Sequence, residues 1–164
     1  MRKLRILKKG ATYLVTSRIV RDFNDLTPDE FKNMFIDVIK RAKKKYKFSV
    51  KNFVIMPNHY HFIIDPKEGS LPKIMQWILS VFARKYNKIN NFSGCFWKSR
   101  YCSKILESIK EFIDSFILIS NNPVRKKIIN DPKDYPFGGM YFILRKIFDI
   151  VDEPIFDLKF WYFF

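Results

Sequence analysis

The chain has 164 residues, of which 48% are hydrophobic, which fits one domain with a substantial core. Lys and Arg number 31 against 16 Asp and Glu, giving a formal net charge of +15. Such an excess attracts a polyanion, so it predicts a nucleic-acid partner. Two cysteines are too few for a disulfide framework, and no apolar run is long enough for a signal peptide or a membrane span. We therefore expect a cytoplasmic protein with no membrane partner.

The first predicted elements are a strand and an amphipathic helix. Residues 11–20 are rich in Thr, Val and aromatic residues, which is typical of a strand. A helix then begins at Thr27, which can cap it, and Glu30 completes a capping box. Apolar residues follow at helical spacing and predict a buried face: Phe31, Met34, Phe35, Val38, Ile39 and Ala42.

Five further elements are predicted downstream, namely strands at 48–56, 59–65 and 94–106 and helices at 70–88 and 107–122. Ser70 can cap the first of these helices, whereas Ser108 and Glu111 form a capping box for the second, which Pro123 ends. The order of elements predicts an α+β domain in which helices cover one face of an antiparallel sheet. The other face would remain open for a ligand.

The two histidines of the chain lie two positions apart, within the predicted strand 59–65. Side chains alternate across a strand, so His59 and His61 share a face, whereas Tyr60, Phe62 and Ile64 point into the core. Two adjacent imidazoles can share one metal ion, although two surface histidines can also be neighbours by accident. The spacing alone leaves both interpretations open.

Basic and aromatic residues mark a candidate nucleic-acid surface. Cations alternate along the strand-like run 94–106 and continue beyond the last predicted helix, and aromatic side chains in the same run can stack on unpaired bases. The predicted contacts are Arg84, Lys98, Arg100, Lys104, Arg125, Lys126 and Trp97. Each cation could also be a solvated surface charge.

Five stretches together resemble the single-tyrosine HUH transposases, and most closely the branch that includes the REP-associated tyrosine transposases. In chain order they are GATYLVTSR, MPNHYHFII, LPKIMQWILSVFARKYNK, FWKSRY and NNPVRKKIINDPKDYPF. An ordered set of motifs is far more specific than any single one. The resemblance predicts a transposase-like domain at 1–138, followed by an extension at 139–164 that packs on the domain or on a partner.

The resemblance implies a ferredoxin-like or RRM-like fold with a four- or five-stranded antiparallel sheet. It implies that His59, His61 and Asn122 hold Mg²⁺ or Mn²⁺, and that the substrate is single-stranded or hairpin DNA. In this family the ion polarises a scissile phosphate, and a helix tyrosine attacks it and becomes joined to the 5′ end. The resemblance leaves open whether the chain is a monomer or a homodimer.

The nucleophile position departs from the family pattern. The tyrosine is expected four residues before Asn122, where this chain has Leu118, which could be an ordinary core leucine. Tyr101 is a weaker candidate nucleophile, because it is more simply explained as a core or base-stacking aromatic. Three functions follow: a transposase that cuts and joins single-stranded DNA, a catalytically inactive domesticated relative that binds DNA, and an RRM-like RNA-binding module.

Overall fold

The computed structural model describes residues 7–20, 25–67 and 69–154. Its strands are β1 (Tyr13–Arg18), β2 (Ser49–Ile55), β3 (His59–Asp65) and β4 (Cys102–Ile105). Its α-helices are α1 (Asp29–Tyr46), α2 (Leu71–Ile89), α3 (Ile109–Ser120), α4 (Asn122–Arg125) and α5 (Gly139–Leu144), with a 3-10 turn at Pro132–Asp134.

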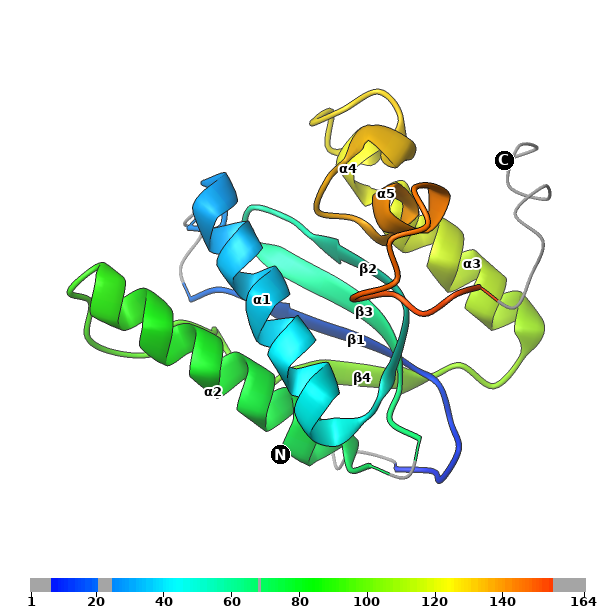
Figure 1. Ribbon diagram of the computed structural model, residues 1–164, viewed down its shortest axis with the longest axis horizontal. Helices are drawn as coiled ribbons and strands as arrows, with labels where there is room; N and C mark the ends of the chain where they lie inside the picture. The colour runs from blue at the N-terminus through cyan, green and yellow to red at the C-terminus, as the bar shows by residue number, and fades with distance from the viewer. Residues whose placement is uncertain (1–6, 21–24, 68, 155–164) are drawn as a thin grey trace.

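The four strands form one antiparallel sheet in the order β2-β3-β1-β4 (Figure 1). In the chain order β1-α1-β2-β3-α2-β4, this is the ferredoxin-like arrangement. The two central strands are β1 and β3, which are separated in sequence by α1 and β2. The α+β fold predicted from the order of elements is therefore confirmed.

One face of the sheet packs against α1 and α2. Phe35 of α1 contacts Tyr60 of β3 and Phe82 of α2, with ring centroids 5.3 Å and 4.8 Å away. All three rings are fully buried. Removing one such side chain from water stabilises the fold by roughly 1.5–3 kcal/mol. The inward-facing side chains of β3 and the apolar stripe of α1 thus pack together in one aromatic core.

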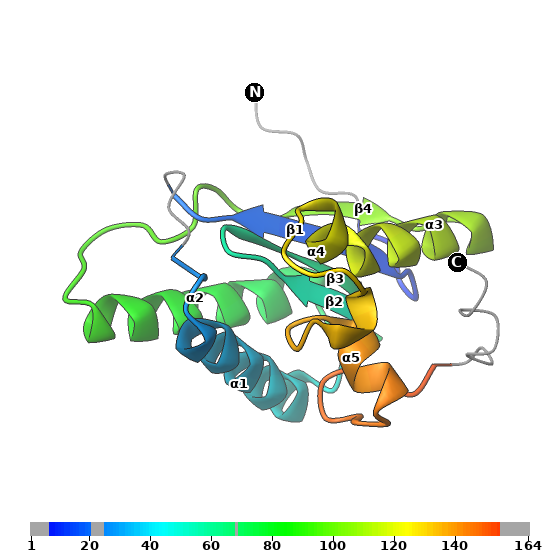
Figure 2. The ribbon, with the colours of Figure 1, turned by 90° about the horizontal axis from the view of Figure 1, so that it is seen from above.

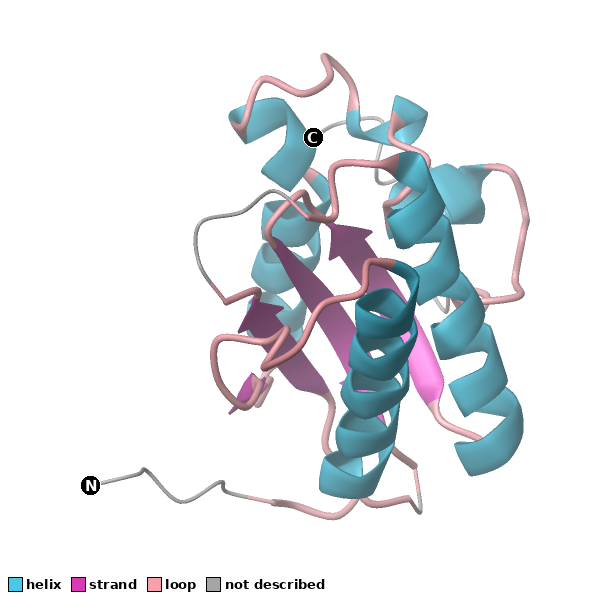
Figure 3. Cartoon of the chain, turned by 90° about the vertical axis from the view of Figure 1, so that its left-hand side faces the viewer, coloured by secondary structure: helices cyan, strands magenta, loops and turns pink. Residues whose placement is uncertain are grey.

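The second face is not left wholly open, because α3 crosses it. Figures 2 and 3 show α3 on the side of the sheet opposite to α1 and α2. The buried Asn52 of β2 holds α3 against the sheet, because the Asn52 side-chain amide donates to the Phe116 carbonyl at 3.2 Å and to Ser120 Oγ at 2.8 Å. Val54 and Ile63 are also buried on this face. The expectation of an open face therefore holds only for the part of this face that α3 does not cover, which includes the His59 end of β3 and the end of β1.

The ends of the helices differ from two expectations. Thr27 does not cap α1, because the helix begins at Asp29 after Pro28 and has no side-chain cap. The capping box at α3 is present in part: Ser108 Oγ accepts from the Glu111 amide at 3.1 Å, while the Glu111 carboxylate accepts from the backbone N–H of Glu107.

Two predicted elements are shorter than the sequence suggested. The strand expected at 94–106 is regular only over β4, while residues 94–101 form bends around a single bridge between Trp97 and Ile19. The helix expected at 107–122 ends at Ser120, and a short second helix, α4, starts at Asn122 with Pro123 in its first turn.

Residues 139–154 pack against the edge of the sheet at β2. The backbone at Phe137 and Gly138 bridges to β2, and Phe142 of α5 lies 5.5 Å from the Phe53 ring, between centroids. Asp152 donates its backbone N–H to Val50 and accepts from the Lys43 ammonium. The aromatic tail, 155–164, lies outside the described residues, and no helix within those residues is long and apolar enough to cross a bilayer.

Candidate metal and nucleic-acid site

The histidine pair lies on the half of the sheet that α3 leaves uncovered. On β3, Tyr60 faces α1, so His59 and His61 project from the opposite face, with ring centroids 5.0 Å apart. The antiparallel register places Arg18 of β1 opposite His59 and Thr16 opposite His61. The expectation that both imidazoles share a face is confirmed.

An open hollow of about 360 Å³ surrounds the pair. Its nine lining residues are Thr16, Ser17, Arg18, His59, His61, Lys98, Ser99, Arg100 and Cys102. The segment 96–98 follows the end of β1, since the backbone N–H of Lys98 donates to Arg18 O at 2.9 Å, and this pairing carries Lys98 and Arg100 to the rim. Three of the lining side chains are cations and none is acidic, so the hollow favours an anion.

Both imidazoles are held neutral at physiological pH. Burial lowers the pKa of His61 to about 4, and burial, followed by the charges of His61, Arg18 and Lys126, lowers the pKa of His59 to about 4. His59 Nδ1 lies 2.6 Å from Asn58 Oδ1, which is an acceptor. In the tautomer in which Nδ1 donates to this oxygen, Nε2 keeps its lone pair. A neutral imidazole with its second nitrogen fixed in this way is the usual form of a metal ligand.

His61 supplies a second observation that fits a metal ion. Its Nδ1 is buried and has no protein hydrogen-bond partner, which is costly unless a water molecule or an ion satisfies it. Over the described ranges, no three His, Cys, Asp or Glu side chains gather closely enough to hold an ion. A third protein ligand at this pair would therefore be an amide or a hydroxyl.

Asn122 is the first residue of α4 and is partly buried. Its carbonyl accepts from the backbone N–H of Lys126, so the two residues lie one turn apart on the same side. The charge of Lys126 is close enough to lower the pKa of His59. The segment from Asn122 to Lys126 thus lies near the histidine end of the sheet.

Leu118 is not the core leucine that its apolar surroundings suggested, because 45% of it is exposed. Glu111, seven residues earlier on the same side of α3, pairs with Lys104 of β4 at 2.8 Å. Leu118 therefore lies on the side of α3 that faces β4 and the uncovered half of the sheet. The regular helix is interrupted at Asn121, between Leu118 and Asn122.

Two aromatic residues that the sequence suggested for the site, Tyr101 and Trp97, do not present their functional groups to the hollow. Tyr101 is 5% exposed and precedes β4 on the α1–α2 side, so its hydroxyl is not presented to a ligand as a nucleophile requires. Trp97 packs its ring between Phe35 and Phe82 and donates Nε1–H to the Leu79 carbonyl, which removes it from base stacking. Their aromatic character looked the same in sequence as that of an exposed stacking residue.

The predicted cations are divided between several surfaces. Lys98 and Arg100 line the hollow, and Lys126 lies within electrostatic reach of His59, while Arg125 is exposed at the end of α4. Lys104 is paired with Glu111 beside the hollow. Arg84 is exposed on α2, on the opposite face of the sheet, so the structure does not bring it to this site.

Sequence reasoning missed two residues of the site. Arg18 comes from the strand predicted at 11–20, but only the register with β3 places it opposite His59. Asn58 lies between the strands predicted at 48–56 and 59–65, and its side chain lies within hydrogen-bond distance of the His59 ring. Its position directly before the first histidine was a usable signal, because hydrogen-bond acceptors commonly orient metal-ligating imidazoles.

Comparison with known proteins identifies the family. The family model described as transposase IS200-like matches residues 15–118, more than half of the chain. The chain therefore belongs to the IS200-like transposase family, which confirms the resemblance seen in the motifs. None of the curated proteins that were compared matches the chain.

Two solved structures share the fold. A REP-associated tyrosine transposase bound to a REP hairpin has a TM-score of 0.74 and 20% identity, covering 96% of this chain and 94% of that one. A candidate transposase from Deinococcus radiodurans R1 has a TM-score of 0.50 and 17% identity, covering 71% of this chain and 95% of that one. The first likeness extends past residue 138, because a share of 96% leaves only a few residues outside.

Proposed function

We propose that this chain is a transposase-family protein that binds single-stranded or hairpin DNA over the basic hollow and holds a divalent ion with His59, His61 and Asn122. The observation that carries the proposal is the pair of neutral imidazoles inside a rim of three cations with no acidic lining residue. Family membership and the fold shared with a hairpin-bound transposase favour DNA over RNA as the nucleic acid.

In this proposal, the cations of the hollow bind DNA and the residues around the histidines hold the metal ion. Arg18, Lys98 and Arg100 neutralise phosphates, while Asn58 fixes the His59 ring so that its Nε2 can act as a ligand. Bound there, Mg²⁺ or Mn²⁺ would polarise a phosphodiester oxygen. Leu118 has no nucleophilic atom, so we expect no covalent attachment to DNA through position 118 and no strand transfer by that route.

An adduct assay tests the proposal. Labelled hairpin DNA is incubated with the protein and Mn²⁺, and products are separated under denaturing conditions. We expect bound DNA in native gels and no adduct with the wild-type chain. Leu118→Tyr should produce an adduct that resists denaturation, because position 118 lies on the side of α3 that faces the uncovered half of the sheet.

Ile117→Tyr is the matched control, since it adds the same phenol 100° away around the helix and should give no adduct. An adduct with the wild-type chain, or none with Leu118→Tyr while DNA and Mn²⁺ still bind, would contradict the assignment of position 118. Free nicked DNA would point to water as the attacking group. Equal affinity for a matched RNA hairpin would favour an RNA-binding module instead.

A further inference from the structure

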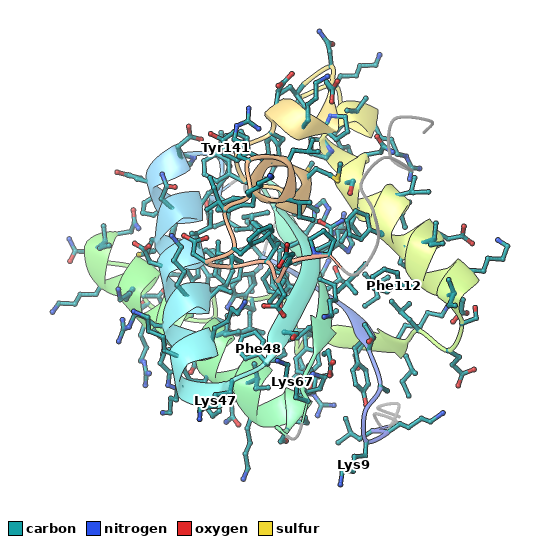
Figure 4. The ribbon with its side chains drawn as sticks, turned by 45° about the vertical axis from the view of Figure 1, so that its right-hand side comes forward. Lys9, Lys47, Phe48, Lys67, Phe112 and Tyr141 are labelled. Atoms are coloured by element: carbon teal, nitrogen blue, oxygen red, sulfur yellow. The ribbon has the colours of Figure 1, made fainter. Side chains whose placement is uncertain are left out.

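An apolar groove lies at the end of the sheet opposite to the histidines. It has a volume of about 300 Å³, and its walls come from Thr12 before β1, Leu106 after β4, the first turns of α3, and the chain near Pro154. Figure 4 shows Phe112 between α3 and the strands, at one wall. Ile109, the first residue of α3, also lines the groove and is 69% exposed.

The described part of the chain ends at this groove. Asp152 is anchored there through its backbone N–H to the Val50 carbonyl at 2.9 Å and through its carboxylate to the Lys43 ammonium. Pro154, the last described residue, is itself part of the groove wall. The described part of the chain therefore ends at the wall of an apolar groove.

The ten residues that follow Pro154 read IFDLKFWYFF, of which eight are apolar or aromatic. Such a composition is costly to leave in water. Ten extended residues reach up to about 33 Å, and the 12 residues of α3 span about 18 Å. The segment is long enough to fill the groove, and its Asp157 carries a charge opposite to that of Lys51 at the groove wall.

We propose that residues 155–164 dock in this groove within the same chain, covering Ile109, Phe112 and Leu106. Attachment at the rim gives the segment a high effective concentration, which favours the chain's own tail over that of a second copy. The groove lies on the flank of α3 away from Leu118, so docking completes the fold and does not involve the DNA surface. The inference is independent of the proposed function.

Tryptic release of the last five residues, after Lys159, tests the proposal on the full-length chain. Docking should protect this bond, and Ile109→Glu should speed its cleavage by about tenfold or more, because cleavage follows the population of the undocked state. Glu suits the first turn of a helix, so the variant keeps α3 intact. The matched control is Ile89→Glu, at a 62% exposed isoleucine at the end of α2, which should leave the rate unchanged.

Phe156→Ser removes the other side of the contact and should speed cleavage similarly, with no further gain when it is combined with Ile109→Glu. Equal rates in wild type, Ile109→Glu and Ile89→Glu would overturn the proposal, as would additive effects in the double variant. Size-exclusion chromatography tests the remaining alternative, in which a second copy of the chain occupies the groove. A wild-type dimer that Ile109→Glu dissociates would show that a second copy, and not the chain's own tail, occupies the groove.

Discussion

At the scale of single residues, the site depends on imidazoles that remain neutral. The pKa of each histidine is lowered to about 4, first of all by burial. In the unfolded chain both titrate near 6.5, so between pH 6.5 and 4 the unfolded state binds protons that the folded state does not. Stability is therefore full above pH 6.5 and falls as the pH decreases toward 4.

This linkage predicts that the free energy of unfolding falls by about 1–2 kcal/mol between pH 7.5 and 5.5, less than the full shifts imply, because the rings are partly exposed. Urea titrations at both values measure it. The double variant His59→Gln, His61→Gln carries no histidine and should lose most of that pH dependence. The same pH dependence in variant and wild type would show that these rings are not the buried groups responsible.

The same residues show what a sequence can say about a site. His59 and His61 could be assigned to one face because alternation in a strand is fixed by the backbone. Arg18 could not be added, since its place opposite His59 depends on the register between two strands that are 40 residues apart in sequence. Trp97 could not be separated from a base-stacking aromatic, because its burial depends on α1 and α2 together.

At the scale of elements, Asn52 joins two helices to β2. Its amide holds α3, and its Oδ1 accepts from the Phe53 backbone N–H at 2.8 Å. Gly139, at the start of α5, lies so close that a Cβ there would come within 2.2 Å of that oxygen and 3.0 Å of the Phe53 nitrogen. A methyl group at position 139 would therefore disturb the packing of both α3 and α5.

We expect Gly139→Ala to lower the free energy of unfolding by about 2–4 kcal/mol, because a buried hydrogen-bond network must move. Gly138→Ala is the control, since a Cβ there meets nothing closer than 3.4 Å and the cost should be below about 1 kcal/mol. Denaturant titration measures both. Similar losses for the two variants would mean that the backbone near α5 yields without disturbing Asn52.

The elements themselves were predictable where one residue pattern decides them. The alternation of β3 and the amphipathic spacing of α1 each follow from local sequence, and both elements are present. The packing of α3 was predictable only in part: the helix is amphipathic, but the sequence does not show which face of the sheet its apolar side meets. Its contacts arise from Asn52, a buried polar residue in a strand that otherwise appeared simply apolar.

At the scale of the whole molecule, the net charge of +15 is not evidence for one surface, because cations lie on both faces of the sheet. Arg18, Lys98 and Arg100 converge on the hollow, whereas Arg84 lies on α2 on the other side. If DNA is attracted by the whole positive surface, all four cations contribute to binding. If a strand binds over the hollow, only the first three contribute. The salt dependence of binding by variants that lack single cations distinguishes these two cases.

For single strands, each phosphate contact contributes about −0.7 to the slope of log K against log salt concentration. We therefore expect Lys98→Gln and Arg100→Gln each to reduce the magnitude of the slope by about that amount, since each variant removes one contact. Arg84→Gln, the same type of charge removal on the opposite face, should leave the slope unchanged. Fluorescence anisotropy with a labelled single strand over a salt series measures all three, and an equal change with Arg84→Gln would mean that DNA is not confined to the histidine face.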